Sequence, residues 1–265
     1  MFSLIYFVQN QRLDFINFKS SRYKNMTFKE IHHKAIERKG GEKQLNKLLT
    51  PVLSQKQLSK VGDDRFLAMM CKAINQAGFN WTVINNKWSQ FEEAFFNFDV
   101  EKLYFMPQEH WEAYTKDKRV VRNWIKIKAV MENTGFIYYT AQDHGSFAKF
   151  IADWPTSDQI GLMAYLKKNG TRLGGNTGHW FLRYVGKDCF TTSHDVIGAI
   201  QQQGHDIKDH PTSKRDLTVV QDVFNQWHQE TGLCYTHLSK IAAYSRGENN
   251  ETEAIIAQNE KFQVK

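Results

Sequence analysis

Helical periodicity runs through almost the whole chain, and it limits the fold more than any other feature. Apolar residues recur every three or four positions, and no long run alternates with period two. Only four of the 265 residues are prolines, which interrupt helices. The spacing predicts helices over 63–78, 81–95, 122–134, 146–154, 158–169, 176–185, 193–203, 213–231 and 236–244. We therefore expect an all-α protein of roughly ten helices with short connections.

Several residue pairs mark where these helices begin and end. Thr27 with Glu30 forms a capping box before an apolar-periodic stretch. Ser213 with Asp216 marks the beginning of the last long helix. Gly135 is expected to end the helix 122–134, because glycine weakens a helix interior.

The two ends of the chain differ from the helical pattern. Residues 1–25 show no periodicity, so we expect an N-terminal extension from a mis-assigned start codon; a docked strand or helix is the alternative. Residues 26–248 are expected to form one helical domain. Residues 249–265 are polar and predict a helical or frayed tail.

Composition narrows the class of protein and of partner. Lys and Arg outnumber Asp and Glu by 35 to 28, a moderate basic excess that suits a phosphate-rich partner. The three cysteines are scattered, as in intracellular proteins with reduced thiols, and the histidines show no zinc-binding spacing. No apolar run approaches the roughly 20 residues that a membrane span requires. We expect a cytoplasmic bacterial protein, nucleoid-associated in use, without metal or other cofactor.

The segment 166–177 predicts a helix, a tight glycine-containing turn and a second helix. Glycines let a backbone approach a phosphate closely, and free N–H groups at the start of a helix attract the anion. Lys167 adds positive charge nearby. We interpret the segment as a helix-hairpin-helix that grips a nucleic-acid backbone without reading bases; an ordinary helix end at Gly170 followed by a loop is the alternative. The predicted DNA-binding residues are Lys168, Gly170, Arg172, Leu173, Gly174, Gly175, Asn176 and Thr177.

Several motifs occur in the order in which one known family carries them. They are Gln-Ala-Gly-x-x-Trp at 76–81, Phe-x-x-Phe-Asp at 95–99, a basic-apolar helix at 125–130, the hairpin at 166–177 and Asp-Val-Ile-Gly at 195–198. With these motifs the chain resembles the DNA-3-methyladenine glycosylase I family of helix-hairpin-helix glycosylases. Residues 211–217 resemble a divergent bacterial branch of that family.

The resemblance implies a monomeric repair enzyme that flips an alkylated purine, typically N3-methyladenine, out of double-stranded DNA and hydrolyses its N-glycosidic bond. Trp81 would stack on the cationic base, with a core aromatic as the alternative. Gln76 is expected to bind the base edge and to assist catalysis, while Lys72 and Asn75 point elsewhere. Asp195 is the second candidate catalytic residue, with a first-turn carboxylate of its own helix as the alternative.

The chain also departs from the family pattern. The family's base-recognising Glu, eight residues before the Trp, is Ala73 here, and its pocket Tyr falls on Pro51. The family's zinc-binding positions fall on Lys39, Val52, Asp195 and Ala199. We therefore expect no zinc site. Two alternatives stay open, namely a non-catalytic helix-hairpin-helix protein that senses damaged DNA and a glycosylase for another damaged base.

Overall fold

The computed structural model describes residues 26–260, and this part of the chain is helical throughout, with no β-strand. The expected N-terminal extension lies outside the described residues. No helix of the described part is long and apolar enough to span a membrane. The all-α prediction is confirmed.

The α-helices are α2 Phe28–Arg38, α3 Glu42–Leu48, α4 Gln55–Leu58, α5 Asp63–Gln76, α6 Trp81–Asn86, α7 Trp88–Ala94, α8 Val100–Tyr104, α9 Gln108–Ala113, α10 Trp124–His144, α11 Phe147–Asp153, α12 Gln159–Asn169, α13 Asn176–Tyr184, α14 His194–Gln202, α15 Lys214–Thr231, α16 Tyr235–Tyr244 and α17 Thr252–Glu260, with 3-10 turns η1 Phe96–Phe98 and η2 Thr156–Asp158.

The described part has 16 α-helices, more than the ten expected. Short helices such as α3, α4 and α8 have too few turns to show a periodic pattern. The expected helix 81–95 divides at Lys87 into α6 and α7. Both predicted caps are confirmed: the Glu30 carboxylate accepts from Thr27 N at 2.7 Å, and Ser213 Oγ accepts from Asp216 N at 3.1 Å.

The prediction that Gly135 ends a helix is wrong. α10 continues through Gly135 to His144 and ends at Gly145, whose φ is 84°. Asn133, Thr134 and Ile137, on either side of the glycine, are buried. Their packing outweighs the cost of a glycine in a helix interior, which is about 1 kcal/mol.

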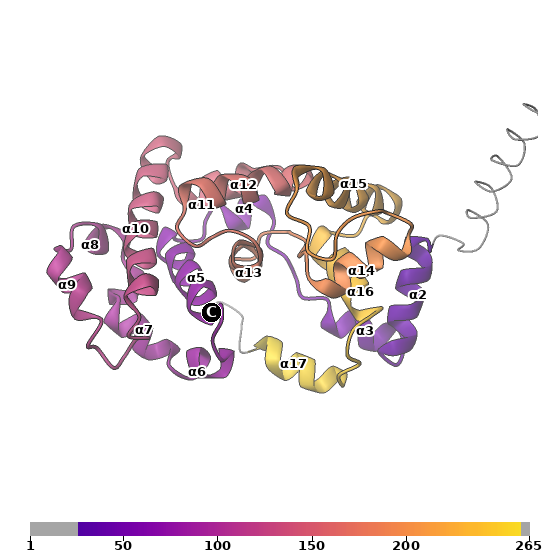
Figure 1. Cartoon of the computed structure of the whole chain (residues 1–265), viewed down its shortest axis with the longest axis horizontal. Coiled ribbons are helices and arrows are strands. Elements are labelled where there is room, and N and C mark those ends of the chain that lie inside the picture. Colours follow the sequence, from indigo (N-terminus) through magenta and orange to yellow (C-terminus); the bar gives the residue numbers. More distant parts are fainter. Residues whose placement is uncertain (1–25, 261–265) are drawn as a thin grey trace, which may run out of the picture.

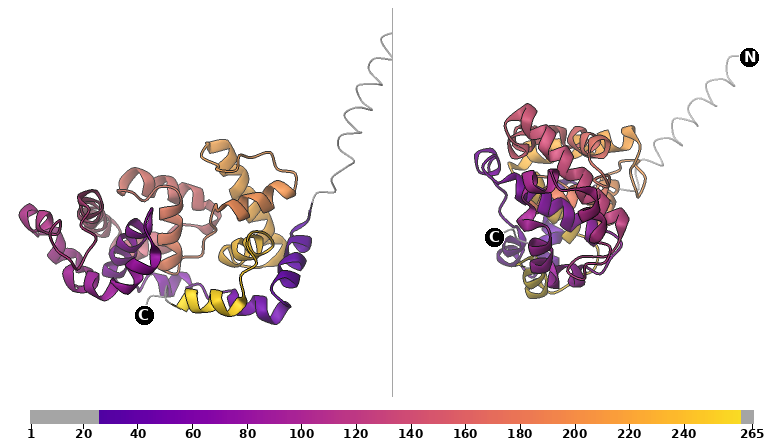
Figure 2. Two further views of the ribbon diagram at one scale, coloured as in Figure 1. Left: turned by 60° about the horizontal axis from the view of Figure 1, so that its bottom comes forward. Right: turned by 90° about the vertical axis from the view of Figure 1, so that its left-hand side faces the viewer.

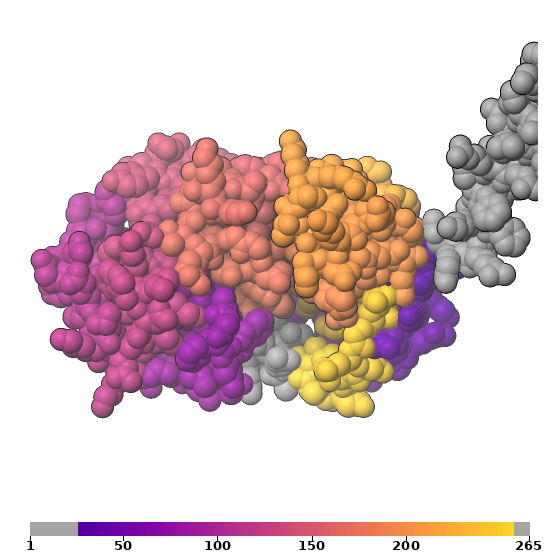
Figure 3. Space-filling model, in the orientation of Figure 1, coloured from indigo at the N-terminus to yellow at the C-terminus, as the bar shows by residue number. Residues whose placement is uncertain are grey.

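The buried apolar residues form two separate cores. The first core includes residues of α5, α7, α10, α11, α12 and α13, and the second includes residues of α2, α3, α14, α15 and α16. The two groups of helices lie side by side along the long axis of the molecule (Figure 1, Figure 2). In the space-filling view the two groups meet across the middle, where the salmon-coloured part of the surface borders on the orange part (Figure 3), and α12 contacts α15. The second core thus combines helices from both ends of the described chain.

A buried hydrogen-bonded segment, residues 189–191, joins the two cores. Gln159 of α12 exchanges two hydrogen bonds of 2.8 Å with the backbone of Phe190. On the other side, Cys189 N donates to Thr236 Oγ1 of α16 at 3.0 Å. Because buried backbone groups must be paired, these side chains fix the segment between α12 and α16.

The same glutamine forms a hydrogen bond with a buried histidine. His179 of α13 is 3% exposed, and its Nδ1 accepts from Gln159 Nε2 at 2.9 Å. Burial lowers the pKa of His179 to about 4, with Arg183 acting in the same direction. The folded protein therefore holds this imidazole neutral.

This buried imidazole predicts a loss of stability in weak acid. An unfolded histidine takes up a proton below pH of about 6.5, whereas folded His179 does so only near its lowered pKa, so the unfolded state binds more protons between these values. We expect His179 to reduce the free energy of unfolding by about 2 kcal/mol between pH 7 and pH 5. Urea unfolding at both pH values checks this against His179→Asn, which keeps an acceptor but does not titrate. An equal pH dependence in both proteins would contradict the assignment.

Candidate functional site

The carboxyl end of α5 is anchored by a lysine from another helix. Lys126 of α10 is 8% exposed, and its ammonium donates to the carbonyls of Ile74, Asn75 and Ala77 at 3.0, 2.8 and 2.9 Å. A cation is favourable here because the last carbonyls of a helix lack partners and carry the negative end of its dipole. Lys126 thereby fixes the turn that leads from α5 to Trp81.

Gln76, predicted to bind the base, is a buried junction between three helices. Its side chain is 2% exposed. Its Oε1 accepts from the Tyr184 hydroxyl of α13 at 2.9 Å, and its Nε2 donates to Asn85 Oδ1 of α6 at 3.2 Å. Gln76 therefore holds Tyr184 in a defined position beside the end of α5.

Trp81, Trp180 and Tyr184 together form a group that we call the aromatic wall. The rings of Trp81 and Trp180 meet edge to face at 5.3 Å between centroids, and Trp180 stacks on Tyr184 at 5.9 Å. Trp81 is partly exposed, whereas Tyr184 is buried. A flat base can stack on such rings whatever its sequence context. Trp180 is thus a neighbour of the predicted base-binding residue.

Lys72 lies beside the aromatic wall, so the expectation that it points elsewhere is wrong. Its ammonium lies 5.2 Å from the ring centroid of Trp88 and 5.9 Å from that of Tyr184, and the side chain is 4% exposed. Burial lowers the pKa of Lys72, and the Glu92 carboxylate opposes this shift. The spacing of four residues between Lys72 and Gln76 on one helix was the signal available in the sequence.

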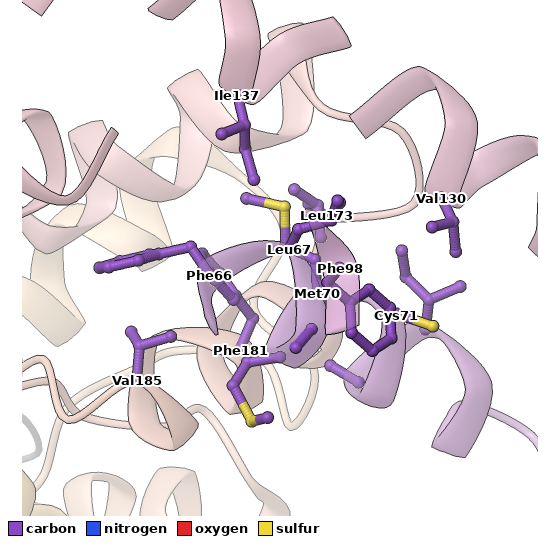
Figure 4. Packing of buried hydrophobic residues seen from close by; sticks show 14 of the residues in the cluster. Phe66, Leu67, Met70, Cys71, Phe98, Val130, Ile137, Leu173, Phe181 and Val185 are labelled. Carbon is purple, nitrogen blue, oxygen red and sulfur yellow. The ribbon is translucent and has the colours of Figure 1, made fainter. Parts of the chain in front are cut away.

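The hairpin has the predicted form of two helices around a tight turn. α12 ends at Asn169, and α13 begins at Asn176. Leu173, in the turn, is fully buried and lies beside Leu67 and Met70 of α5 (Figure 4). Arg172, next to it, has a positive φ of 61° and is exposed. The buried leucine thus anchors the turn while its basic neighbour faces solvent.

Two glycines let the turn run close to α13. Gly175 has φ 56° and ψ −141°, a conformation that is essentially limited to glycine. A Cβ on Gly178 would lie 2.4 Å from the Leu173 carbonyl oxygen. Gly175 and Asn176 are exposed, so the first N–H groups of α13 begin at an accessible surface. This geometry fits the phosphate grip predicted for residues 170–177, and the DNA contacts themselves stay a prediction.

An asparagine of α10 holds the turn from the inside. Asn133 is fully buried; its Nδ2 donates to Thr171 O at 3.0 Å, and its Oδ1 accepts from Thr171 N at 2.8 Å. The exposed pair of Thr171 Oγ1 and Glu132 Oε2 at 2.8 Å adds a third contact. The hairpin is therefore tied to the helix that also supplies Lys126.

Asp195 is not brought together with the other candidate residues. It lies in the first turn of α14, which packs on α16 and α15 in the second core. Its carboxylate faces the backbone of Gly247, where an added Cβ would lie 2.5 Å from Oδ2. Gln76 and Trp81 lie on α5 and α6, which border the first core. The placement favours the alternative of a first-turn carboxylate.

The positions that correspond to the family's zinc site do not fit a metal. Lys39 donates to Asn249 Oδ1 at 3.1 Å and to Asn250 O at 3.0 Å, so a cationic side chain already ties α2 to the segment before α17. Val52 and Ala199 have no donor atoms in their side chains. Within residues 26–260, no group of three His, Cys, Asp or Glu could hold a metal ion.

Comparison with known proteins confirms the resemblance over part of the chain. Residues 57–171 match the family described as methyladenine glycosylase, a segment that includes Lys72, Gln76, Trp81 and the beginning of the hairpin turn. No curated protein matches significantly. A 3-methyladenine DNA glycosylase I from Staphylococcus aureus is 24% identical, with a TM-score of 0.41 over 53% of this chain and 84% of that one. An 8-oxoguanine glycosylase/lyase from Methanocaldococcus jannaschii, solved with DNA, is 14% identical, with a TM-score of 0.47 over 81% of this chain and 96% of that one.

The buried contact between Asn133 and the turn predicts a large effect of one substitution. Asn133→Ala leaves the N–H and C=O of Thr171 without their partner, which we expect to cost about 2–3 kcal/mol of unfolding free energy. Glu132→Gln removes only an exposed charge and should change it by less than about 0.5 kcal/mol. Urea unfolding of both variants checks this, and equal effects would mean that Asn133 does not hold the turn.

Proposed function

We propose that this chain, which carries the methyladenine glycosylase match, is a DNA repair glycosylase that flips alkylated purines of the 3-methyladenine type out of duplex DNA and hydrolyses the N-glycosidic bond. It would act as a monomer on the bacterial nucleoid in the cytoplasm, without a metal. One observation carries the proposal. α13 begins at the exposed hairpin end and carries Trp180 and Tyr184 of the aromatic wall. At 1.5 Å per residue, Asn176 and Tyr184 are about 12 Å apart along the helix axis, so one helix joins the predicted phosphate grip to the aromatic wall.

The family's base-recognising Glu is replaced here by Ala73, but the proposed reaction can proceed without it. An N-alkylated purine in DNA already carries positive charge and leaves without a strong acid. The remaining tasks are to extrude the base, to orient it and to stabilise the positive charge that forms on the sugar, which a water molecule then attacks as the neutral base leaves. Trp81 would stack on the extruded base, and Gln76 would act indirectly by holding Tyr184 beside it. With Asp195 in the second core, we assign it no step in base release.

Extrusion also needs a group that fills the gap left in the duplex. Phe79, in the turn between α5 and α6, is 44% exposed, and the Lys126 ammonium lies 5.5 Å from its ring centroid. Apolar wedges of this kind are what DNA-bending proteins insert between base steps. We infer that Phe79 fills this role, because it stands two residues before Trp81 on a turn that Lys126 fixes.

Release of free methylated purines tests the enzyme. We expect the wild-type protein to release them from alkylated genomic DNA, as resolved by chromatography. Trp81→Ala should lower the rate about 10- to 100-fold, the value of one base–aromatic stack. Trp81→Phe keeps a ring and should retain most of the activity. Duplex binding with no base release would instead identify a non-catalytic sensor of damaged DNA.

Salt dependence tests the hairpin separately. Each phosphate contact contributes about one unit to the slope of log K against log salt, so Lys168→Gln and Arg172→Gln should each reduce the slope by about one. Lys29→Gln removes an exposed charge from α2, a helix that packs in the second core, and should leave the slope unchanged.

Two glycine variants distinguish a role of the hairpin in DNA binding from a general effect of backbone strain. Gly175→Ala should weaken DNA binding more than Gly145→Ala, since both positions have positive φ but Gly145 ends α10 outside the hairpin. Equal losses of binding would remove the hairpin from the DNA-binding surface.

A further inference from the structure

Residues 116–128 carry most of the excess positive charge of the chain, and the proposed function uses only Lys126 among them. They hold six Lys or Arg residues and one Asp, a net charge of +5 in a chain whose total is +7. The single acid, Asp117, is already paired with Arg119 at 2.7 Å. The segment consists of the loop after α9 and the beginning of α10. A basic cluster of this density is the electrostatic footprint of a nucleic-acid backbone.

Lys118, Arg122 and Lys128 of this segment are exposed, and we call them the basic ridge. Within the described part of the chain, Lys118 and Arg122 form no salt bridge. Lys128 lies 3.6 Å from the Glu132 carboxylate, but an exposed pair of this kind contributes little stability. A phosphate can therefore replace Glu132 as the partner of Lys128 at small cost.

The basic ridge lies between two parts of the proposed site. At one end, the Lys87 ammonium, at the junction of α6 and α7, donates to the Lys118 carbonyl. At the other end, Thr171 of the hairpin turn donates to Glu132 at 2.8 Å, one helical turn after Lys128. The ridge is thus continuous with the predicted phosphate grip of the hairpin.

The spacing between ridge and hairpin suits the second strand of a duplex. Lys128 and Glu132 are four residues apart, which is about 6 Å along the axis of α10. The two backbones of B-DNA face each other across a minor groove about 6 Å wide. A hairpin turn that holds one backbone therefore places Lys128 near the other.

An exposed apolar side chain stands within the ridge. Ile125 is 61% exposed and lies between Arg122 and Lys128 in the sequence. Proteins that bind the minor groove insert apolar side chains of this kind between bases and flank them with cations. Phe79 is already inferred to fill the gap on the strand of the flipped base, so Ile125 is available for the opposite strand.

We propose that the basic ridge binds phosphates of the DNA strand opposite the flipped base, and that Ile125 contacts the base which flipping leaves unpaired. The inference rests on the proposed function for its partner, duplex DNA. It adds a second surface, separate from the hairpin, that recognises only double-stranded DNA.

Salt dependence measured on two forms of DNA tests the ridge. Fluorescence anisotropy gives the affinity for a short unmodified duplex and for one of its strands alone. We expect the triple variant Lys118→Gln, Arg122→Gln, Lys128→Gln to lower the slope of log K against log salt by about 2.7 on the duplex, since each phosphate contributes about 0.9. The slope on the single strand should stay as in the wild type. Arg172→Gln, in the hairpin, should lower both slopes.

A matched control removes the same charge elsewhere. The triple variant Lys29→Gln, Lys43→Gln, Lys47→Gln changes three exposed lysines of α2 and α3 and should keep the wild-type slopes. An equal loss in both triple variants would overturn the ridge, because net charge alone would then explain it. A ridge variant that lowers the duplex and single-strand slopes alike would overturn the assignment to the opposite strand.

These binding measurements need no chemistry, so they separate the inference from the enzyme. If alkylated DNA yields no free base but the ridge variant loses slope on the duplex alone, the glycosylase proposal fails and the ridge stands. If base is released and the ridge variant keeps the wild-type duplex slope, the ridge is overturned and the glycosylase stands.

A fluorescent base tests the contact of Ile125. In a duplex with 2-aminopurine opposite an abasic analogue, insertion of a side chain beside the 2-aminopurine unstacks it and raises its fluorescence. We expect wild-type protein and Ile125→Leu to produce this rise and Ile125→Ala to lose it. Phe105→Ala removes an exposed ring of similar accessibility after α8 and should keep the rise. A rise of the same size with Ile125→Ala would overturn the contact.

Discussion

The enclosure of α5 is the constraint on which the rest of the structure depends. Every residue from Phe66 to Gln76 is buried, so protein surrounds the carboxyl half of this helix on all sides. An enclosed helix end must find partners for its last carbonyls inside the protein, and Lys126 provides them from α10. The position of Trp81 therefore depends on α10 as much as on the turn that precedes it.

Local signals predicted much of this architecture. The capping box at Thr27 and the cap at Ser213 need only neighbouring residues, and the glycines of the hairpin mark its turn in the same way. What the sequence did not predict depends on packing and on contacts between residues that are far apart in the chain. Gly135 stays helical because of packing, and the partner of Gln76 is a tyrosine 108 residues away. Periodicity says which face of a helix is buried, but not what lies against that face.

α13 joins the hairpin turn to the aromatic wall. Its beginning is set by Gly175 and by the buried Leu173, and its far end by the hydrogen bond from Tyr184 to Gln76. His179, between them, is locked by Gln159. The hairpin turn and the aromatic wall therefore lie at the two ends of one helix that is fixed at both ends and in the middle.

The second core is assembled from both ends of the described chain, and this has a consequence for its synthesis. The Arg38 guanidinium of α2 donates to the carbonyl of Tyr244, 206 residues later. At a usual elongation rate, adding that many residues takes about 10–40 s. The first core draws its residues from 58–189. It can therefore form before the later helices of the second core, which cover Phe28 and Ile31 of α2, have been synthesised. The apolar face of α2 is thus one that chaperones have time to bind before its partner helices leave the ribosome.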